Sequence, residues 1–353
     1  MTDVNAHLHT PYSFSAFASV DEALDHAAAE GVKVVGINDF YSTDGYAAWK
    51  AGCDARKFYP LFGIEFISLN AEDQAAGLRV NDPNNPGRTY ISGKGLAYPV
   101  KLAGEPLKQL EGVRVESNAQ VESMCAKLNA WLASSGVPVK LDFAEIREKL
   151  TLGSIRERHL AKALRMALQA AGLSLPEIIG DMDLAADPAG VENKLRGKLL
   201  KAGGPAFVPE SPEAFLPMET VQRIIEAAGG IPTYPFLADD AKGNFTDFEG
   251  DLQKAADILR RRGFRSVEFI TTRNTTAVLE NYAGYLEDEG FVVSFGSEHN
   301  TPAMEPVKLR TRDADDLSAK LKQINWRGAC AIAAHQAGLD SIAAGEDLIM
   351  SRI

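Results

Sequence analysis

Val4-Asn5-Ala6-His7-Leu8-His9 opens the chain as a predicted strand that ends in two histidines one residue apart. Successive side chains of a strand alternate between its faces, so both imidazoles are expected on the same side. Histidine is the commonest metal ligand near neutral pH, and the chain contains only six histidines. The pair therefore predicts a metal site at the end of the first strand, and two solvated histidines are the alternative interpretation.

A unit of helix, glycine and apolar strand recurs after this strand. Ser19 and Glu22 match a capping box, and the helix that they open is expected to stop at Gly31, before a strand over 32–37. Continuous apolar strands that alternate with helices indicate a parallel sheet covered by helices, and the number of repeats favours a (β/α) barrel over an open sheet. The same order is expected at 220–234, 251–271 and 276–295.

The repeat is interrupted in the middle of the chain. A turn-rich loop over 82–87 is followed by helical patterns. We therefore expect a barrel formed by residues 1–69 and 219–353, with residues 70–218 as an inserted, mostly helical subdomain over the active face. The helical patterns cover 117–134, 143–151, 158–171 and 191–201.

Composition restricts the class of protein. The chain has 353 residues with 37 basic and 48 acidic side chains, and its net charge of −11 argues against binding a long nucleic-acid duplex. A local basic pocket for one phosphate is compatible with that charge. No window resembles a signal peptide or a membrane span. Cys53, Cys125 and Cys330 lie far apart without a CxxC motif, so we expect reduced thiols in a cytoplasmic protein that has no membrane partner.

Polar side chains follow almost every predicted strand. The carboxyl ends of the strands form the active face of a parallel barrel, so a set drawn from several strands indicates a functional site more strongly than any single residue. The set consists of His7, His9, Asp39, Glu65, Tyr234, Arg273, Glu298 and His299.

Seven short motifs occur in order between residue 4 and about residue 302. They are His7-Leu8-His9-Thr10-Pro11-Tyr12-Ser13, Gly36-Ile37-Asn38-Asp39-Phe40, Gly63-Ile64-Glu65, the stretch 153–164, the stretch 203–209, Ala228-Gly229-Gly230-Ile231-Pro232-Thr233-Tyr234-Pro235 and Gly296-Ser297-Glu298-His299-Asn300. In this order they resemble the PHP (polymerase and histidinol phosphatase) family, closest to its nucleotide phosphoesterase branch. The resemblance implies an α/β fold, a distorted (β/α)7 PHP-type barrel, with a site for two or three metal ions.

The resemblance also implies which side chains hold metal. One ion would be held by His7, His9, Glu65 and Glu298, and a second would use Glu65 and His159. These donors suit zinc, manganese or iron, so we expect one or two divalent ions.

Several family ligands are substituted in this chain. Tyr234 either ligates through its phenol oxygen or packs as a half-buried aromatic ring, and His299 stands one residue from the family's last histidine and is a further candidate ligand. The other substituted positions are Ala16, Phe40, Asn300 and Glu298, which replaces an aspartate and can still ligate a metal.

Four side chains are candidates for contact with substrate or for positioning. Arg156, Arg158 and Arg273 either hold a phosphate through bidentate hydrogen bonds or are ordinary surface arginines. Asp39 either orients a metal-binding histidine or caps the loop after its strand.

These expectations combine into a metal-dependent hydrolase that uses metal-activated water to cut a phosphomonoester or a nucleotide phosphodiester. Its substrate would be a small phosphorylated molecule such as a nucleotide. Two alternatives stay open. A degenerate PHP barrel would bind metal or a phosphorylated ligand without turnover, which the substituted ligands favour. A metal-dependent hydrolase of a non-phosphate bond is the third interpretation, because a metal site alone does not name its substrate.

Overall fold

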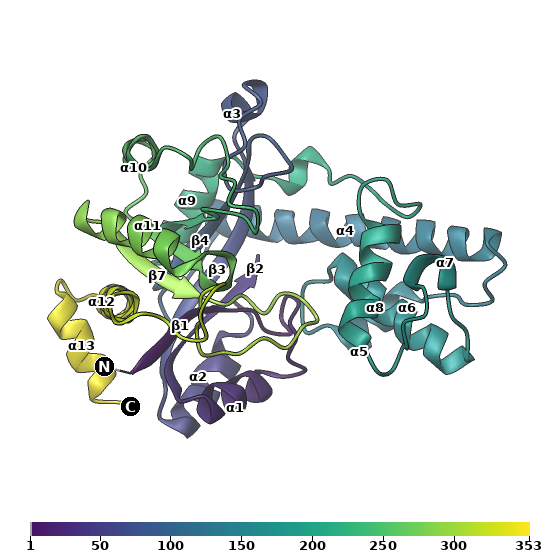
Figure 1. Ribbon diagram of the computed structural model, residues 1–353, viewed down its shortest axis with the longest axis horizontal. Coiled ribbons are helices and arrows are strands. Elements are labelled where there is room, and N and C mark those ends of the chain that lie inside the picture. Colours follow the sequence, from purple (N-terminus) through teal and green to yellow (C-terminus); the bar gives the residue numbers. More distant parts are fainter. Residues whose placement is uncertain (1) are drawn as a thin grey trace.

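The computed structural model describes residues 2–353 and is built around one seven-stranded sheet whose strands lie in chain order (Figure 1). A parallel bridge between Leu8 and Glu298 joins the end of the first strand to the segment after the last. The sheet is therefore a nearly closed barrel, which confirms the predicted α/β barrel class. Its strands are β1 (Asp3–Leu8), β2 (Val32–Phe40), β3 (Tyr59–Leu69), β4 (Arg88–Lys94), β5 (Ile231–Phe236), β6 (Ser266–Ile270) and β7 (Val292–Gly296).

One strand departs from the predicted parallel sheet. β4 pairs antiparallel with both β3 and β5, whereas the other neighbouring strands pair in parallel. Between β3 and β4 the chain forms only a turn-rich excursion with the short helix α3 (Ala71–Ala75), and a parallel pairing would need a full crossover. β4 also lies within residues 70–218, so part of the segment expected as an insertion is a barrel strand.

Helices cover the outside of the barrel and pack on its apolar side chains (Figure 1). The expected capping box is half formed at the start of the first of them: the Ser19 hydroxyl accepts from the Glu22 N–H, whereas the Glu22 carboxylate accepts from the N–H of Ala18 instead of that of Ser19. The barrel helices are α1 (Val20–Ala29), α2 (Tyr46–Arg56), α9 (Met218–Ala227), α10 (Leu252–Arg261), α11 (Thr276–Asp288), α12 (Ala319–Gln336) and α13 (Ile342–Met350).

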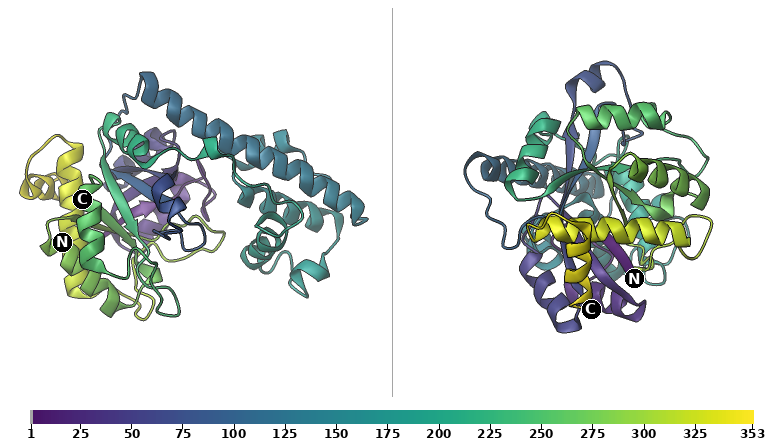
Figure 2. Two further views of the ribbon diagram at one scale, coloured as in Figure 1. Left: turned by 90° about the horizontal axis from the view of Figure 1, so that it is seen from above. Right: turned by 90° about the vertical axis from the view of Figure 1, so that its left-hand side faces the viewer.

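A second group of helices forms a region of its own beside the barrel. The 31-residue helix α4 (Gly104–Ser134) runs from the barrel into this helical region and is about 46 Å long at 1.5 Å per residue (Figure 2). The region has a separate apolar core, which includes Leu128, Leu164 and Leu195. Its other helices are α5 (Phe143–Leu150), α6 (Glu157–Ala171), α7 (Pro176–Ile179) and α8 (Pro188–Leu195).

The helical patterns predicted in the middle of the chain are confirmed, although α4 begins 13 residues earlier than expected. Among residues 2–353, no helix is both long enough and apolar enough to span a membrane.

Candidate metal centre

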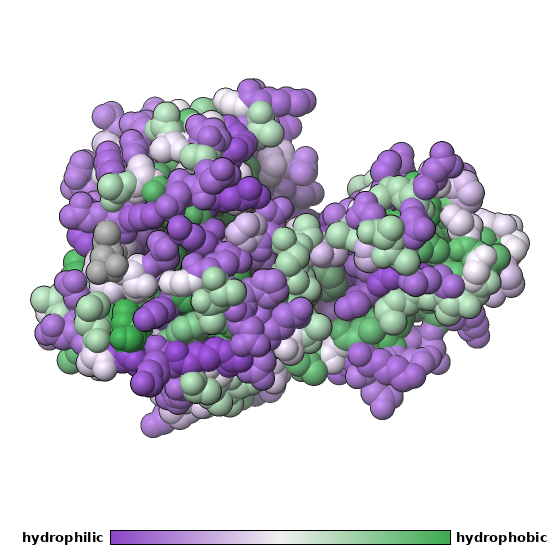
Figure 3. All heavy atoms as spheres, turned by 60° about the horizontal axis from the view of Figure 1, so that its bottom comes forward, coloured by the Kyte–Doolittle hydropathy of each residue, from purple (hydrophilic) through white to green (hydrophobic). Residues whose placement is uncertain are grey.

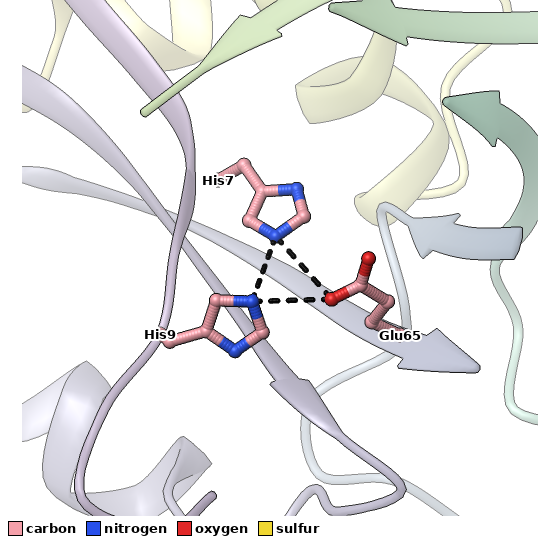
Figure 4. Close-up of side chains that lie close together, drawn as sticks. All are labelled: His7, His9 and Glu65. Atoms are coloured by element: carbon pink, nitrogen blue, oxygen red, sulfur yellow. Dashed lines mark hydrogen bonds and ion pairs between the residues drawn. The ribbon is translucent and has the colours of Figure 1, made fainter. Parts of the chain in front are cut away.

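Three donor atoms from two strands converge on one point inside the barrel (Figure 4). His7 lies on β1, His9 follows that strand directly, and Glu65 lies on β3. The two histidine Nε2 atoms are 3.2 Å apart, and Glu65 Oε2 lies 3.1 Å from His9 Nε2 and 3.8 Å from His7 Nε2. All three side chains are buried. The spacing of two along β1 therefore places both imidazoles on the same side, facing a carboxylate.

The distances fit a divalent ion. A tetrahedral ion with ligands at 2.0–2.1 Å separates its donor atoms by about 3.3 Å, which matches the spacing of these three atoms. Glu65 Oε2 has no hydrogen-bond partner although it is buried. Burial raises the pKa of Glu65 to about 8 despite the opposing influence of His7, so the carboxylate lacks a full counter-charge. A bound cation would supply that charge.

Hydrogen bonds behind each histidine leave its Nε2 free. The Glu268 carboxylate accepts from His7 Nδ1 at 2.9 Å. The Ser13 hydroxyl donates to Asp39 Oδ1 at 2.6 Å, so its oxygen accepts from His9 Nδ1 at 3.2 Å. Burial lowers the pKa of His9 to about 4, so this imidazole is neutral at pH 7 and able to bind a metal.

Asp39 lies behind His9 and does not face the converging donors. Its carboxylate accepts from the backbone N–H of Thr10 at 2.7 Å, from the Thr10 hydroxyl at 2.5 Å and from Ser13. It therefore holds both the loop after β1 and, through Ser13, the ring of His9. Both roles considered from the sequence are compatible with this arrangement.

Two charged residues of the barrel interior are not among those predicted from the sequence. Glu268 lies in the middle of β6 and Lys94 at the end of β4, and these residues are 0% and 2% exposed. Lys94 Nζ lies 2.7 Å from Glu268 Oε2. A charged residue inside an otherwise apolar strand requires a buried partner, and this is the signal that could have drawn attention to Glu268.

Glu298 closes the barrel beside this group of donors. Its N–H donates to the His7 carbonyl at 3.0 Å, and its own carbonyl accepts from the His9 N–H at 2.7 Å. Its carboxylate forms an ion pair of 2.8 Å with Arg273. Among the described residues, the donors that lie within 4.8 Å of one another are those of His7, His9 and Glu65, so the Glu298 carboxylate lies outside that set.

His299 and His159 lie apart from the three converging donors. Both ring nitrogens of His299 have partners, the Ser297 hydroxyl at 2.9 Å and the Glu305 carbonyl at 2.7 Å. His159 lies in the first turn of α6, where its Nδ1 accepts from the Arg156 N–H at 2.9 Å. The structure does not bring either imidazole into the three-donor group.

Aromatic side chains occupy two positions at which the family resemblance implies metal ligands. The ring of Phe40 stacks on His9, with 5.0 Å between the ring centroids. The Tyr234 hydroxyl donates to Glu249 at 2.7 Å, and its ring is fully buried against other aromatic rings.

A cavity of about 1030 Å³ extends from Glu65 towards the helical region. Figure 3 shows the molecular surface narrowing between the barrel and that region. Six cationic side chains line the cavity. Four have carboxylate partners within 4.0 Å, and within the described part of the chain no ion pair is found for the other two, Arg156 and Arg158. The paired cations are Arg88, Arg196, Lys201 and Arg273.

The guanidinium of Arg156 is held at the barrel side of this cavity. It lies over the ring of Phe40, 4.8 Å from the centroid, and that ring stacks on His9. Arg158 Nη1 contacts the side-chain oxygen of Asn193 at 3.3 Å. Both arginines therefore present positive charge to the cavity that the metal candidate Glu65 also lines.

Comparison with known proteins identifies the fold. No family profile and no curated protein matches the sequence. The chain is similar to a solved amidohydrolase from Chromobacterium violaceum, with a TM-score of 0.60 and 17% identity over 91% of this chain and 95% of that one. It is also similar to a protein from Bifidobacterium adolescentis with a provisional assignment as a metal-dependent phosphoesterase, with a TM-score of 0.57 and 16% identity over 91% and 94% of the chains. Both likenesses extend over nearly the whole length.

Proposed function

We propose that this protein is a hydrolase of the PHP type, with part of the family's metal set substituted, and that it cuts a phosphoester with the help of one divalent ion. The observation that carries the proposal is the convergence of His7 Nε2, His9 Nε2 and Glu65 Oε2 at the spacing of a tetrahedral site. Bound there, such an ion would supply an activated water at neutral pH and would polarise a phosphoryl oxygen. Zinc, manganese or iron suits these donors.

Each residue of the site has a role in this proposal. His7, His9 and Glu65 hold the ion, and Glu298, which stands at the same cavity, is the candidate for a fourth ligand. Arg273 pairs with Glu298 and balances its charge. Arg156 and Arg158 bind the phosphate of a small substrate such as a nucleotide and stabilise the negative charge that develops on it.

Two observations support a phosphate ester over another bond. Arg156 and Arg158 are the cavity cations for which no carboxylate partner is found among residues 2–353, so both are free to bind an oxyanion. The amidohydrolase from Chromobacterium violaceum was solved with bound sulfate and without metal. Sulfate is also a tetrahedral oxyanion, so a related barrel binds an anion with the shape of phosphate.

A second candidate function is metal or ligand binding without turnover. The observation that favours it is the packing of Phe40 on His9 and of Tyr234 against Glu249, because these rings fill positions where further ligands would stand. Hydrolysis of phosphate esters normally divides the stabilisation of attacking and leaving oxygens between two ions. In this second function, a site whose single ion is not enough for hydrolysis would bind substrate without turnover.

The test combines metal analysis with a phosphate-release assay. We expect about one divalent ion per chain, and release of inorganic phosphate from a panel of nucleotide and sugar phosphates that is faster with manganese or zinc than with magnesium. The His9→Ala variant, purified in parallel, should lose both properties, because activity that survives it belongs to a contaminant. A filled metal site without activity on any substrate would favour the binding function.

A further inference from the structure

A buried ion pair lies directly beneath the candidate metal centre, inside the barrel. Lys94 Nζ is 2.7 Å from Glu268 Oε2, and the same carboxylate oxygen accepts from His7 Nδ1 at 2.9 Å. Lys94 also donates to the Ala6 carbonyl and to Asn38 Oδ1, each at 3.0 Å. The ammonium group therefore has three acceptors, which suits its three N–H donors.

These contacts fix the ring of His7 from two sides. An ionised carboxylate can only accept, so His7 Nδ1 carries the proton that Glu268 receives. Lys94 can only donate, so the oxygen of the Asn38 amide faces Lys94 and its nitrogen faces His7. Asn38 Nδ2 lies 3.2 Å from His7 Nε2 and 3.3 Å from His7 Nδ1, so this contact holds the ring in place without distinguishing its two nitrogens. The Glu268 contact is therefore the one that selects the tautomer whose Nε2 carries no proton.

We propose that Glu268 and Lys94 are positioning residues of the metal centre, which hold His7 with Nδ1 protonated and Nε2 directed at the ion. This inference rests on the proposed function, because it concerns residues that orient His7, which the proposed function makes a metal ligand. A carboxylate behind a ligating histidine raises its basicity and fixes its orientation. Lys94 cancels the charge of Glu268, so the pair orients the imidazole without adding net charge beneath the centre.

Stability alone does not explain the pair. Taking two charges out of water costs about as much as their attraction returns, and well-packed apolar side chains of similar volume commonly replace a buried pair without loss of stability. The pair is therefore expected to matter more for metal binding than for folding.

Two double variants separate the hydrogen-bond acceptor from the charges. Lys94→Met/Glu268→Met removes both charges and the acceptor for His7 Nδ1, whereas Lys94→Met/Glu268→Gln removes both charges and keeps an acceptor. We expect the dissociation constant for zinc, measured by competition with a chelator, to rise about 10- to 100-fold in the first variant and by less than about threefold in the second.

A second readout does not depend on metal. Nitrogen-15 NMR of the metal-free protein should show the Nδ1–H tautomer of His7 in wild type and in Lys94→Met/Glu268→Gln, and a mixture of tautomers in Lys94→Met/Glu268→Met. Circular dichroism confirms that each variant is folded. The matched control is Arg165→Met/Glu192→Met, which removes a partly buried ion pair of 2.8 Å from the helical region and should change neither readout.

Unchanged zinc affinity and an unchanged His7 tautomer in folded Lys94→Met/Glu268→Met would overturn the inference. If that variant does not fold, an Nε2–H tautomer of His7 in the wild type would overturn it equally. Failure of the wild type to bind zinc, manganese or iron would instead contradict the proposed function, and the tautomer measurement would still decide the role of Glu268.

Discussion

The barrel and the helical region bury very different side chains. The core of the helical region is a cluster of apolar residues such as Leu160, Leu164 and Leu168. The centre of the barrel instead buries His7, Glu65, Lys94 and Glu268, with His9 and Asp39 beside them. Burying charged groups costs free energy, so a barrel that needed only a stable core would bury apolar side chains at its centre. The buried polar and charged groups around the three converging donors therefore lie in the barrel, whereas the helical region contributes an apolar core and several of the cations that line the cavity.

The largest effect should come from removing a converging donor of the barrel. In His9→Ala we expect metal content to fall from about one ion per chain to less than about 0.1, and phosphate release to fall at least about 1000-fold, because in the proposed function the ion would supply the activated water. Elemental analysis and the phosphate assay measure both. His335→Ala, which alters an exposed histidine on α12, is the control and should behave as wild type. Retained metal in His9→Ala would contradict the assignment of the site.

A cavity in the helical core should destabilise that region and spare the metal centre. Leu164 is 1% exposed, so Leu164→Ala is expected to cost about 2–5 kcal/mol of unfolding free energy. Urea unfolding is followed by the fluorescence of Trp131, which packs against this core, in a background without the barrel tryptophans Trp49 and Trp326. Met166→Ala, at a side chain that is 43% exposed, should cost less than about 0.5 kcal/mol. Loss of metal in Leu164→Ala would show that the two regions are not separable.

A change at the border between the two regions should weaken substrate binding alone. Arg156→Met removes a guanidinium from the cavity, and a hydrogen bond to a charged group contributes about 1.5–3 kcal/mol. We expect KM for a phosphorylated substrate to rise about 10- to 100-fold while metal content stays constant. Arg114→Met, whose guanidinium pairs with Asp44, is the matched control. Unchanged KM in Arg156→Met would remove this residue from the substrate site.

The smallest effect concerns pH. Because the pKa of Glu65 is raised to about 8 by burial, the metal-free carboxyl group is protonated at pH 7, and metal binding must displace that proton. Metal affinity should therefore fall as pH falls below about 8, by up to about tenfold per pH unit. Titrations at pH 6, 7 and 8 measure this slope, and it should be absent in Glu65→Gln, which binds more weakly throughout. An affinity that is constant from pH 6 to 8 in wild type would contradict the prediction.

Local sequence rules are enough to predict the barrel class and the convergence of His7, His9 and Glu65. The alternation of side chains along a strand places His7 and His9 on one side, and Glu65 interrupts an apolar strand. Each of these features can be seen within a few residues of sequence. They lead to the same point in the structure because neighbouring strands of a barrel end at the same face.

The remaining features depend on contacts that no local pattern contains. Glu268 and His7 are 261 residues apart in the chain. Lys94, which pairs with Glu268, lies on a strand that is hard to predict because the sequence around it is rich in turn residues. The antiparallel course of β4 accompanies a connection in which the only helix is the five-residue α3, so that no crossover helix carries the chain back across the sheet. The Arg273–Glu298 pair likewise joins two loops whose approach depends on the closure of the barrel.

That closure has a consequence for the timing of biosynthesis. The first strand meets the segment after the last one, and Asn5 and Ser297, which bond across this seam, are separated by 292 positions. At ~5–20 residues per second, a ribosome takes roughly 15 to 60 s to synthesise that interval. During this time His7 and His9 have left the exit tunnel without the strand that encloses them. Metal is therefore expected to enter after the segment that contains Ser297 has been synthesised, and a nascent chain that ends before this segment should bind it poorly.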